Sequence, residues 1–216
     1  MNKIKKKFLD LFFPKKCLGC GKSDTYLCTD CFKQIQIILI VERPKDAYLD
    51  RIISVTNYAN SLIRELIKSF KYYYVQELSE PLSQLLIRVL ENFDTSFKVF
   101  NFIIIPIPLH EHRLRYRGFN QAELLAKQIA NHFNLPIETN ILKRIVPTGP
   151  QANIKDINKR KNNIKDVFNI IPNSVEGKNI LLIDDVCTTG ATLIEAARVL
   201  KLNGAREIWA LVVAKG

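Results

Sequence analysis

Residues 180–192 carry the pattern that most restricts the fold of this chain. Four aliphatic residues at 180–183 lead directly into Asp184 and Asp185, and residues 188–192 read Thr-Thr-Gly-Ala-Thr before a helical pattern begins. A short, wholly apolar strand is typical of the inside of a parallel sheet, and such sheets bind ligands at the carboxyl ends of their strands. The segment therefore predicts a strand, a loop and a helix with polar residues at a ligand-binding edge.

The loop after the two aspartates is predicted to bind an anion. Threonine hydroxyls, the unobstructed backbone at Gly190 and the positive end of the next helix all converge there. Two adjacent carboxylates would repel a phosphate unless a cation intervenes, so we expect a sugar phosphate whose hydroxyls bind Asp184 and Asp185, with Mg²⁺ nearby. The alternative is structural: a solvated acidic turn followed by a helix cap, a common use of Asp and Thr.

Apolar periodicity elsewhere predicts strands that alternate with helices. We expect helices over 58–70, 78–93, 122–133 and 191–202, and strands over 102–107, 179–183 and 208–213. This alternation indicates an α/β domain, an open parallel sheet with helices on both faces. We expect the domain to span residues 45–216, following a basic N-terminus and a small metal-binding module over residues 1–44.

Four of the five cysteines lie close together, in the pattern Cys17-x2-Cys20-x7-Cys28-x2-Cys31. Two Cys-x-x-Cys turns present the four thiolates that a tetrahedral structural zinc requires. Disulfides are the alternative, and they are typical of small secreted domains. Because the segment has few apolar residues, we expect the metal to supply most of its folding free energy and the core of the main domain to be separate from it.

A basic segment at 106–121 follows one predicted strand and opens a predicted helix. Arg113, Arg115 and Arg117 alternate along it, so in an extended loop they would share one side and could bind pyrophosphate oxygens. The alternative is a solvated basic turn before a helix that starts at Asn120. The two histidines of this segment are interpreted as hydrogen-bonded loop residues rather than metal ligands.

The segment 180–192 resembles the signature of type I phosphoribosyltransferases, which bind phosphoribosyl pyrophosphate (PRPP). The resemblance implies that Asp184 and Asp185 hold the ribose hydroxyls and help to position Mg²⁺. It also implies that the 5′-phosphate is held by the loop residues Thr188, Thr189, Gly190, Ala191 and Thr192. Cys187 stands where an aliphatic residue is usual, and we interpret it as a small buried apolar side chain.

With Arg117-Gly118-Phe119-Asn120-Gln121, the cysteines upstream and the PRPP loop downstream, the chain resembles the ComF family of competence-associated, phosphoribosyltransferase-like proteins. The similarity extends from Cys17 to Val213. It implies a mobile loop over the site, around Arg160 and Asn163. Where the family commonly has Gly-Ala-Phe after that asparagine, this chain has Asp166-Val167-Phe168. The family is associated with DNA uptake in natural transformation.

The resemblance implies two alternative functions. In the first, the protein binds PRPP with Mg²⁺ and transfers the phosphoribosyl group with pyrophosphate as the leaving group, using Asp184, Asp185 and Arg117 for catalysis and Arg113 and Arg117 as further PRPP ligands. In the second, it is a non-catalytic, single-stranded-DNA-binding competence factor that uses PRPP only for regulation. The sequence indicates no acceptor for the phosphoribosyl group, so whether the protein is an enzyme stays open.

The charge distribution favours an anionic partner. The excess of 32 basic over 21 acidic residues lies within residues 1–16 and 143–165, and we expect these segments to bind single-stranded DNA, with phenylalanines in the first 16 residues available for stacking. The uncharged run at 99–109 is too short to span a bilayer. Asp10 interrupts the one stretch that imitates a signal peptide, so we expect a cytoplasmic protein.

Overall fold

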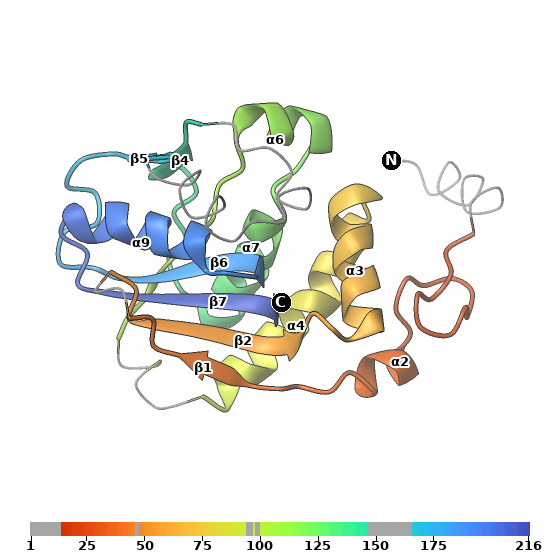
Figure 1. Ribbon diagram of the computed structural model, residues 1–216. Helices are drawn as coiled ribbons and strands as arrows, with labels where there is room; N and C mark the ends of the chain where they lie inside the picture. The colour runs from red at the N-terminus through yellow and green to blue at the C-terminus, as the bar shows by residue number, and fades with distance from the viewer. Residues whose placement is uncertain (1–13, 46–47, 94–96, 98–99, 147–165) are drawn as a thin grey trace.

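The computed structural model describes residues 14–45, 48–93, 97, 100–146 and 166–216, and it is built around a five-stranded sheet (Figure 1). The strand order is β1-β2-β7-β6-β3. Strands β2, β7, β6 and β3 are parallel, and β1 pairs with β2 in the antiparallel direction at one edge. The bounds are β1 Ile40–Glu42, β2 Arg51–Asn57, β3 Ile103–Pro106, β6 Asn179–Cys187 and β7 Glu207–Lys215.

Helices cover both faces of this sheet, as the sequence predicts. One face packs against three helices, α3 Ser61–Tyr72, α4 Ser79–Glu91 and α7 Gln121–Phe133. The other packs against α9 Ala191–Leu202 and a two-stranded sheet of β4 Leu142–Arg144 and β5 Phe168–Ile170. Three short helical segments complete the described part: α2 Thr29–Lys33, η1 Gln76–Leu78 and α6 Glu111–Arg117.

Successive side chains of the central strands point alternately into two hydrophobic cores, one on each face of the sheet. On β6, Leu181 and Ile183 face the core under α3, α4 and α7, whereas Ile180 and Leu182 face the core under α9. Every one of these four side chains is fully buried. A strand buried on both faces needs apolar residues at every position, which is why this segment reads as a continuous aliphatic run.

Strand β2 was not among the predicted elements. It is the second strand of the sheet, yet its sequence contains Ser54 and Thr56, both of them buried. Thr56 donates a hydrogen bond from Oγ1 to the carbonyl oxygen of Val213 at 2.7 Å, so this hydroxyl is satisfied inside the core. Polar residues buried inside a strand interrupt its apolar run, which is why the sequence pattern does not predict β2.

The N-terminal segment shares the core of the main domain, so the expectation of separate cores is wrong. Phe32 and Ile35 are buried in the same cluster as the inner faces of α3 and α4. Arg88 of α4 lies over the Phe32 ring at 4.5 Å from its centroid. Strand β1 also extends the sheet before residue 45. The domain boundary between residues 44 and 45 stays a prediction. Because the N-terminal segment packs into the core of the main domain, the stability of each depends on the other.

Within the described residues, no helix is long and apolar enough to cross a membrane. The cytoplasmic location stays a prediction. Of the two basic segments, 1–16 and 143–165, residues 1–13 and 147–165 lie outside the described part of the chain, so the expected DNA contacts and the expected mobile loop around Arg160 and Asn163 are not tested by the structure.

Candidate functional site

Strand β6 carries the two aspartates to the carboxyl end of the parallel sheet. The strand continues past them to Cys187, and Asp184 lies opposite Val212 of β7. Asp184 Oδ1 accepts a hydrogen bond from the backbone N–H of Asp185 at 2.8 Å. Asp185 is almost fully buried, and its Oδ1 lies 2.6 Å from the Nζ atom of Lys71 at the end of α3. The structure therefore excludes a solvated acidic turn.

Burial gives the acid pair unusual protonation behaviour. Burial and then the neighbouring charge of Asp185 raise the pKa of Asp184 to about 7, although Lys71, the N–H of Asp185 and Arg144 act in the opposite direction. Burial also lowers the pKa of Lys71, but the carboxylates of Asp185 and Asp184 outweigh it, so the net change is upward. The lysine is thus held as a cation against the carboxylates.

The predicted anion loop directly follows this strand. Gly190 has φ +76°, a left-handed conformation that favours glycine, and α9 begins there without a side-chain cap. Thr189 Oγ1 accepts the N–H of Ala191 at 3.4 Å, while Thr188 is exposed and Thr192 is half-buried. A twelve-residue helix thus presents its positive end beside the acid pair, the arrangement predicted for a phosphate-binding loop.

The three alternating arginines do not lie in an extended loop, so that prediction is wrong. Residues Glu111–Arg117 form α6, in which Arg113 and Arg117 lie one turn apart on the same face and Arg115 is exposed on another. The helix forms because His110 caps it, its Nδ1 accepting the N–H of His112 at 3.2 Å. Two arginines rather than three are therefore brought together, and His110 is a cap rather than a metal ligand.

The residues after α6 hold it at the end of β3. Gly118 has φ +76° and ends the helix, and Phe119 inserts into the core with its ring centroid 5.7 Å from that of Phe70. Asn120 caps α7 through its Oδ1 atom and donates from Nδ2 to the carbonyl oxygen of Ile107 at 3.1 Å. Gly118, Phe119 and Asn120 thus each help to fix α6 against the sheet.

Gln121 and Tyr72 position Arg117. The Nη1 atom of Arg117 donates to Gln121 Oε1 at 2.7 Å, and the guanidinium lies over the Tyr72 ring at 5.5 Å from its centroid. Gln121 is 2% exposed, and its Nε2 atom is buried with no hydrogen-bond partner. A buried amide with an unused donor is costly, and it leaves one polar group available at the site beside Arg117.

Three arginines lie near one another, and one of them, Arg144, interacts with Asp184. Burial and then repulsion from Arg117 lower the pKa of Arg113, although Tyr72 acts in the opposite direction. Burial and then repulsion from Arg113 lower the pKa of Arg144, and attraction to Asp184 opposes these effects. The Arg113 guanidinium therefore lies close enough to those of Arg117 and Arg144 to repel both, an arrangement suited to a polyanionic ligand.

Lys71 and Arg144 are the two charged residues of this site that the sequence analysis missed. Lys71 and Tyr72 end a segment, 58–72, that resembles the Leu-Ile…Lys-Tyr helix of the ComF family, but this resemblance gave Lys71 no role at the site. Arg144 lies on β4, a short strand that was not predicted. Both residues are distant in sequence from residues 180–192 and reach the site only through the tertiary fold.

Asp166, which replaces the glycine common in the ComF family, has φ +56°. Asp adopts this left-handed conformation more readily than most residues. Its N–H donates to Glu195 Oε1 at 2.8 Å, and its Oδ1 pairs with Arg198 at 2.7 Å. Contacts with α9 thus support a backbone conformation that favours glycine, at the point where the described chain resumes.

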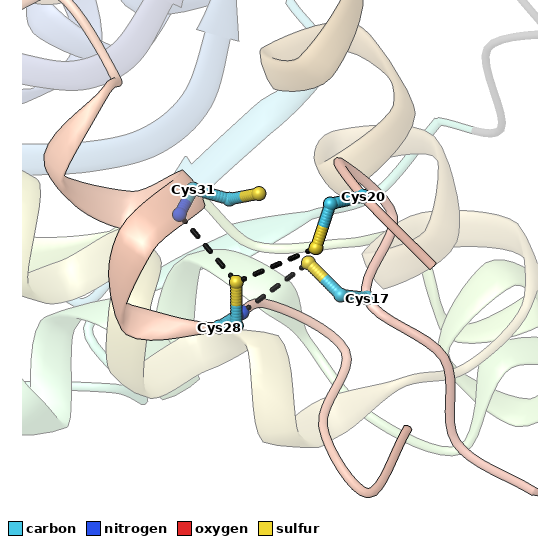
Figure 2. A group of neighbouring side chains, drawn as sticks. All are labelled: Cys17, Cys20, Cys28 and Cys31. Atoms are coloured by element: carbon cyan, nitrogen blue, oxygen red, sulfur yellow. Dashed lines mark hydrogen bonds between the residues drawn. The ribbon is translucent and has the colours of Figure 1, made fainter. Parts of the chain in front are cut away.

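The four N-terminal cysteines form a compact metal-binding cluster (Figure 2). Their sulfur atoms all lie within 4.8 Å of one another, and those of Cys20 and Cys28 are 3.6 Å apart. Tetrahedral zinc with Zn–S bonds of about 2.3 Å requires sulfurs roughly 3.8 Å apart, so the donor set fits. All five cysteines are free, so the disulfide alternative is not supported.

Backbone N–H groups and a glycine turn favour metal binding by this cluster. Burial raises the pKa of Cys17, but N–H groups of Cys28, Cys20 and Gly19 outweigh it and lower the value to about 6. A Cβ atom at Gly19 would lie 2.7 Å from the sulfur of Cys31, so only glycine fits this turn. N–H donors towards sulfur favour the thiolate form that zinc binds.

Two domain models match parts of the chain. Residues 120–216 match the phosphoribosyl transferase domain, and residues 8–44 match the double zinc ribbon domain. Among solved structures, the chain is similar to an adenine phosphoribosyltransferase from Leishmania tarentolae, with a TM-score of 0.44 and 12% identity over 82% of this chain and 94% of that one. The two domain matches, together with the α/β fold and the cysteine cluster, define a phosphoribosyltransferase-like protein with a zinc ribbon.

The chain belongs to the ComF family. It is 30% identical to "Competence protein F" of Haemophilus influenzae, covering 90% of this chain and 83% of that protein. It is 31% identical to "Competence protein ComFC" of Bacillus subtilis, covering 87% and 72%. It is also 30% identical to "DNA utilization protein YhgH" of Escherichia coli, covering 90% and 82%. The family resemblance and the α/β fold predicted from the sequence are confirmed.

The cluster predicts one structural zinc per chain. Cys28→Ser removes one thiolate and should abolish zinc binding. Because Phe32 and Ile35 share the core of the main domain, the loss should destabilise the whole chain, by about 3 kcal/mol or more, instead of unfolding the N-terminal segment alone. Metal analysis and thermal unfolding of reduced protein test this, with Cys187→Ala as the control that keeps zinc. A zinc-free wild-type protein would contradict the assignment.

The raised pKa of Asp184 predicts a pH-dependent penalty on folding. In the folded protein Asp184 keeps its proton up to about pH 7, whereas the ordinary pKa of an aspartate, 3.8, applies to the unfolded chain. The folded state therefore binds one more proton between these two pH values. Its stability from this group is greatest at low pH and is lost as the pH rises from about 4 to about 7. Relative to wild type, Asp184→Asn should therefore become more stable by roughly 2–3 kcal/mol between pH 5 and pH 8, because about two pH units of this window lie below the pKa of about 7 and each is worth about 1.4 kcal/mol. Urea unfolding at both pH values measures the gain. Glu111→Gln, an exposed control, should show none, and parallel pH curves for Asp184→Asn and wild type would refute the prediction.

Proposed function

We propose that the site binds PRPP or a closely related sugar phosphate in the presence of Mg²⁺, and that pyrophosphate is the leaving group where transfer occurs. The observation that carries the proposal is the meeting of three features at one sheet edge: a buried acid pair, the uncapped end of α9 and a group of mutually repelling guanidiniums. The match to the phosphoribosyl transferase domain supports the same ligand.

Each feature corresponds to one part of that ligand. The carboxylates of Asp184 and Asp185 would accept hydrogen bonds from the ribose hydroxyls, and residues 188–192 would bind the 5′-phosphate. Arg113, Arg117 and Arg144 would bind the pyrophosphate group. Carboxylate oxygens are suitable donors for Mg²⁺, which when bound would neutralise charge on the pyrophosphate.

The arrangement favours electrostatic catalysis over covalent chemistry. Guanidinium groups would stabilise the negative charge that develops on the departing pyrophosphate, and the carboxylates would stabilise positive charge on the sugar ring. Burial raises the pKa of the Cys187 thiol, which argues against a nucleophilic role for it. The named relatives are competence and DNA utilization proteins, so we place the activity of this chain in the uptake or use of DNA.

PRPP binding is expected to depend on Mg²⁺ and on the residues assigned to its two ends. Calorimetry should show affinity losses of about tenfold or more for Asp185→Asn and Arg117→Ala, whereas Arg115→Ala, exposed on the same helix as Arg117, should bind like wild type. PRPP at about 100 times its dissociation constant should stabilise the fold by roughly 2.7 kcal/mol. No response to PRPP with Mg²⁺ present would refute the proposal, and pyrophosphate release would separate an enzyme from a regulatory binder.

A second function, binding of single-stranded DNA, is favoured by one exposed surface. We call it the tyrosine surface; it comprises Tyr72, Tyr73, Tyr74 and Tyr116, which are 56%, 60%, 41% and 78% exposed. The rings of Tyr74 and Tyr116 lie 6.2 Å apart, edge to face. The Lys68 ammonium lies 5.7 Å from the centroid of the Tyr73 ring. Exposed aromatic rings with adjacent cations are the elements that bind unpaired nucleotides by stacking and charge.

Single-stranded DNA should lose affinity when this surface is truncated. Tyr116→Ala and Tyr73→Ala should each weaken binding of a mixed-sequence oligonucleotide by about tenfold, the effect of one lost base–aromatic stack. Tyr48→Ala is the control, since Tyr48 is an exposed tyrosine before β2, at the opposite end of the parallel strands. Fluorescence anisotropy at two salt concentrations measures the affinities. Equal affinities for all three variants and wild type would remove this surface from DNA binding.

A further inference from the structure

Lys71 forms an ion pair with Asp185, one of the two aspartates that the proposed function assigns to the ligand. Lys71 lies in the last turn of α3, and its Nζ atom is 2.6 Å from Asp185 Oδ1. The two side chains are 22% and 6% exposed, so this is a largely buried ion pair rather than a solvated surface contact. The sheet edge thus contains its own cation.

This contact conflicts with binding of a divalent cation. The Lys71 ammonium already occupies Asp185 Oδ1, so a Mg²⁺ ion that took this oxygen as a ligand would have to displace it. A Mg²⁺ ion on the other oxygen of the same carboxylate would lie close to the ammonium charge. Two cations on one carboxylate would also repel each other in a poorly solvated site. Lys71 and a divalent cation therefore compete for Asp185.

The position of Lys71 also indicates where its charge can move. It precedes Tyr72, over which the Arg117 guanidinium lies, so the end of α3 adjoins the arginines that would bind pyrophosphate. A lysine side chain is long and flexible, and Lys71 lies at the end of its helix. A polyphosphate bound to Arg113 and Arg117 would thus offer the ammonium group a new anionic partner when it leaves Asp185.

We propose that Lys71 is a positioning residue that occupies Asp185 until a polyphosphate ligand arrives, and that it thereby makes divalent-cation binding depend on PRPP. The inference rests on the proposed function and names a regulation of that same site. It predicts a protein that binds the cation weakly by itself and tightly together with the ligand.

The test measures Mn²⁺ binding by electron paramagnetic resonance at pH 8 with no PRPP added. Lys71→Gln keeps an N–H donor for Asp185 but removes the charge, and it should bind Mn²⁺ at least about tenfold more tightly than wild type. Lys71→Arg keeps the charge and should resemble wild type. Lys201→Gln is the matched control, because Lys201 is 20% exposed and pairs with Asp50 at 3.0 Å away from the site.

A second measurement adds PRPP. PRPP should raise the Mn²⁺ affinity of wild type by more than tenfold and that of Lys71→Gln by clearly less, because the internal competitor is gone. Circular dichroism confirms that each variant is folded. Should Lys71→Gln not fold, Lys71→Arg and wild type are compared instead for the PRPP effect on Mn²⁺, and absence of that effect in both overturns the proposal.

The two possible failures can be told apart. If PRPP binds but Lys71→Gln leaves the affinity for Mn²⁺ unchanged, the role of Lys71 is overturned and the proposed function stands. If Lys71→Gln tightens Mn²⁺ binding while PRPP binds neither protein, competition by Lys71 is supported and the sugar-phosphate function is wrong.

Discussion

The pairing of β6 with β7 is the interaction on which the rest of the structure depends. Their register runs from Asn179 opposite Glu207 to Cys187 opposite Lys215, and the shared interior is buried on both faces. Because the pairing continues past the apolar run, the backbone around Asp184 and Asp185 is held by ladder hydrogen bonds instead of by a loop. The acid pair therefore has a fixed position, and the loop that follows starts α9 directly beside it. A one-residue slip would exchange the two aspartates between the faces of the sheet.

The zinc ribbon depends on the same core in another way. Among the residues that the structure describes, Leu27 and Leu62 pack on its cysteine cluster, which is too little apolar surface to fold alone. The metal would supply the missing free energy locally, and Phe32 and Ile35 attach the segment to α3 and α4. Helix α3 thus contacts the ribbon near its start, through Leu62, and reaches the acid pair at its end, through Lys71. This helix physically connects the two sites, so a loss of zinc that disturbs α3 would also disturb the acid pair.

The sequence predicted those parts of the fold and site in which the signal is local. The strand and loop at 180–192 and the cysteine cluster were recognised because their residues are adjacent or closely spaced, and α9 was predicted with its observed bounds. Strand β2 was missed because Ser54 and Thr56 interrupt its apolar pattern, and the arginine segment was misread because the cap at His110 was not recognised as a helix start. Lys71 and Arg144 join the site through tertiary contacts, which periodicity in a single sequence does not contain.

Charge balance explains how the fold tolerates so many ionisable groups at one edge. Two buried carboxylates would be costly alone, and guanidiniums that repel one another would be costly too. Lys71 neutralises part of the first group, and Asp184 offsets part of the repulsion felt by Arg144. For the acid pair this compensation is partial, since burial and the neighbouring charge of Asp185 keep the pKa of Asp184 raised despite Lys71. Under the proposed function, a ligand with hydroxyl groups at one end and phosphates at the other would bind the carboxylates with the first and the guanidiniums with the second, and so would offset both costs at once.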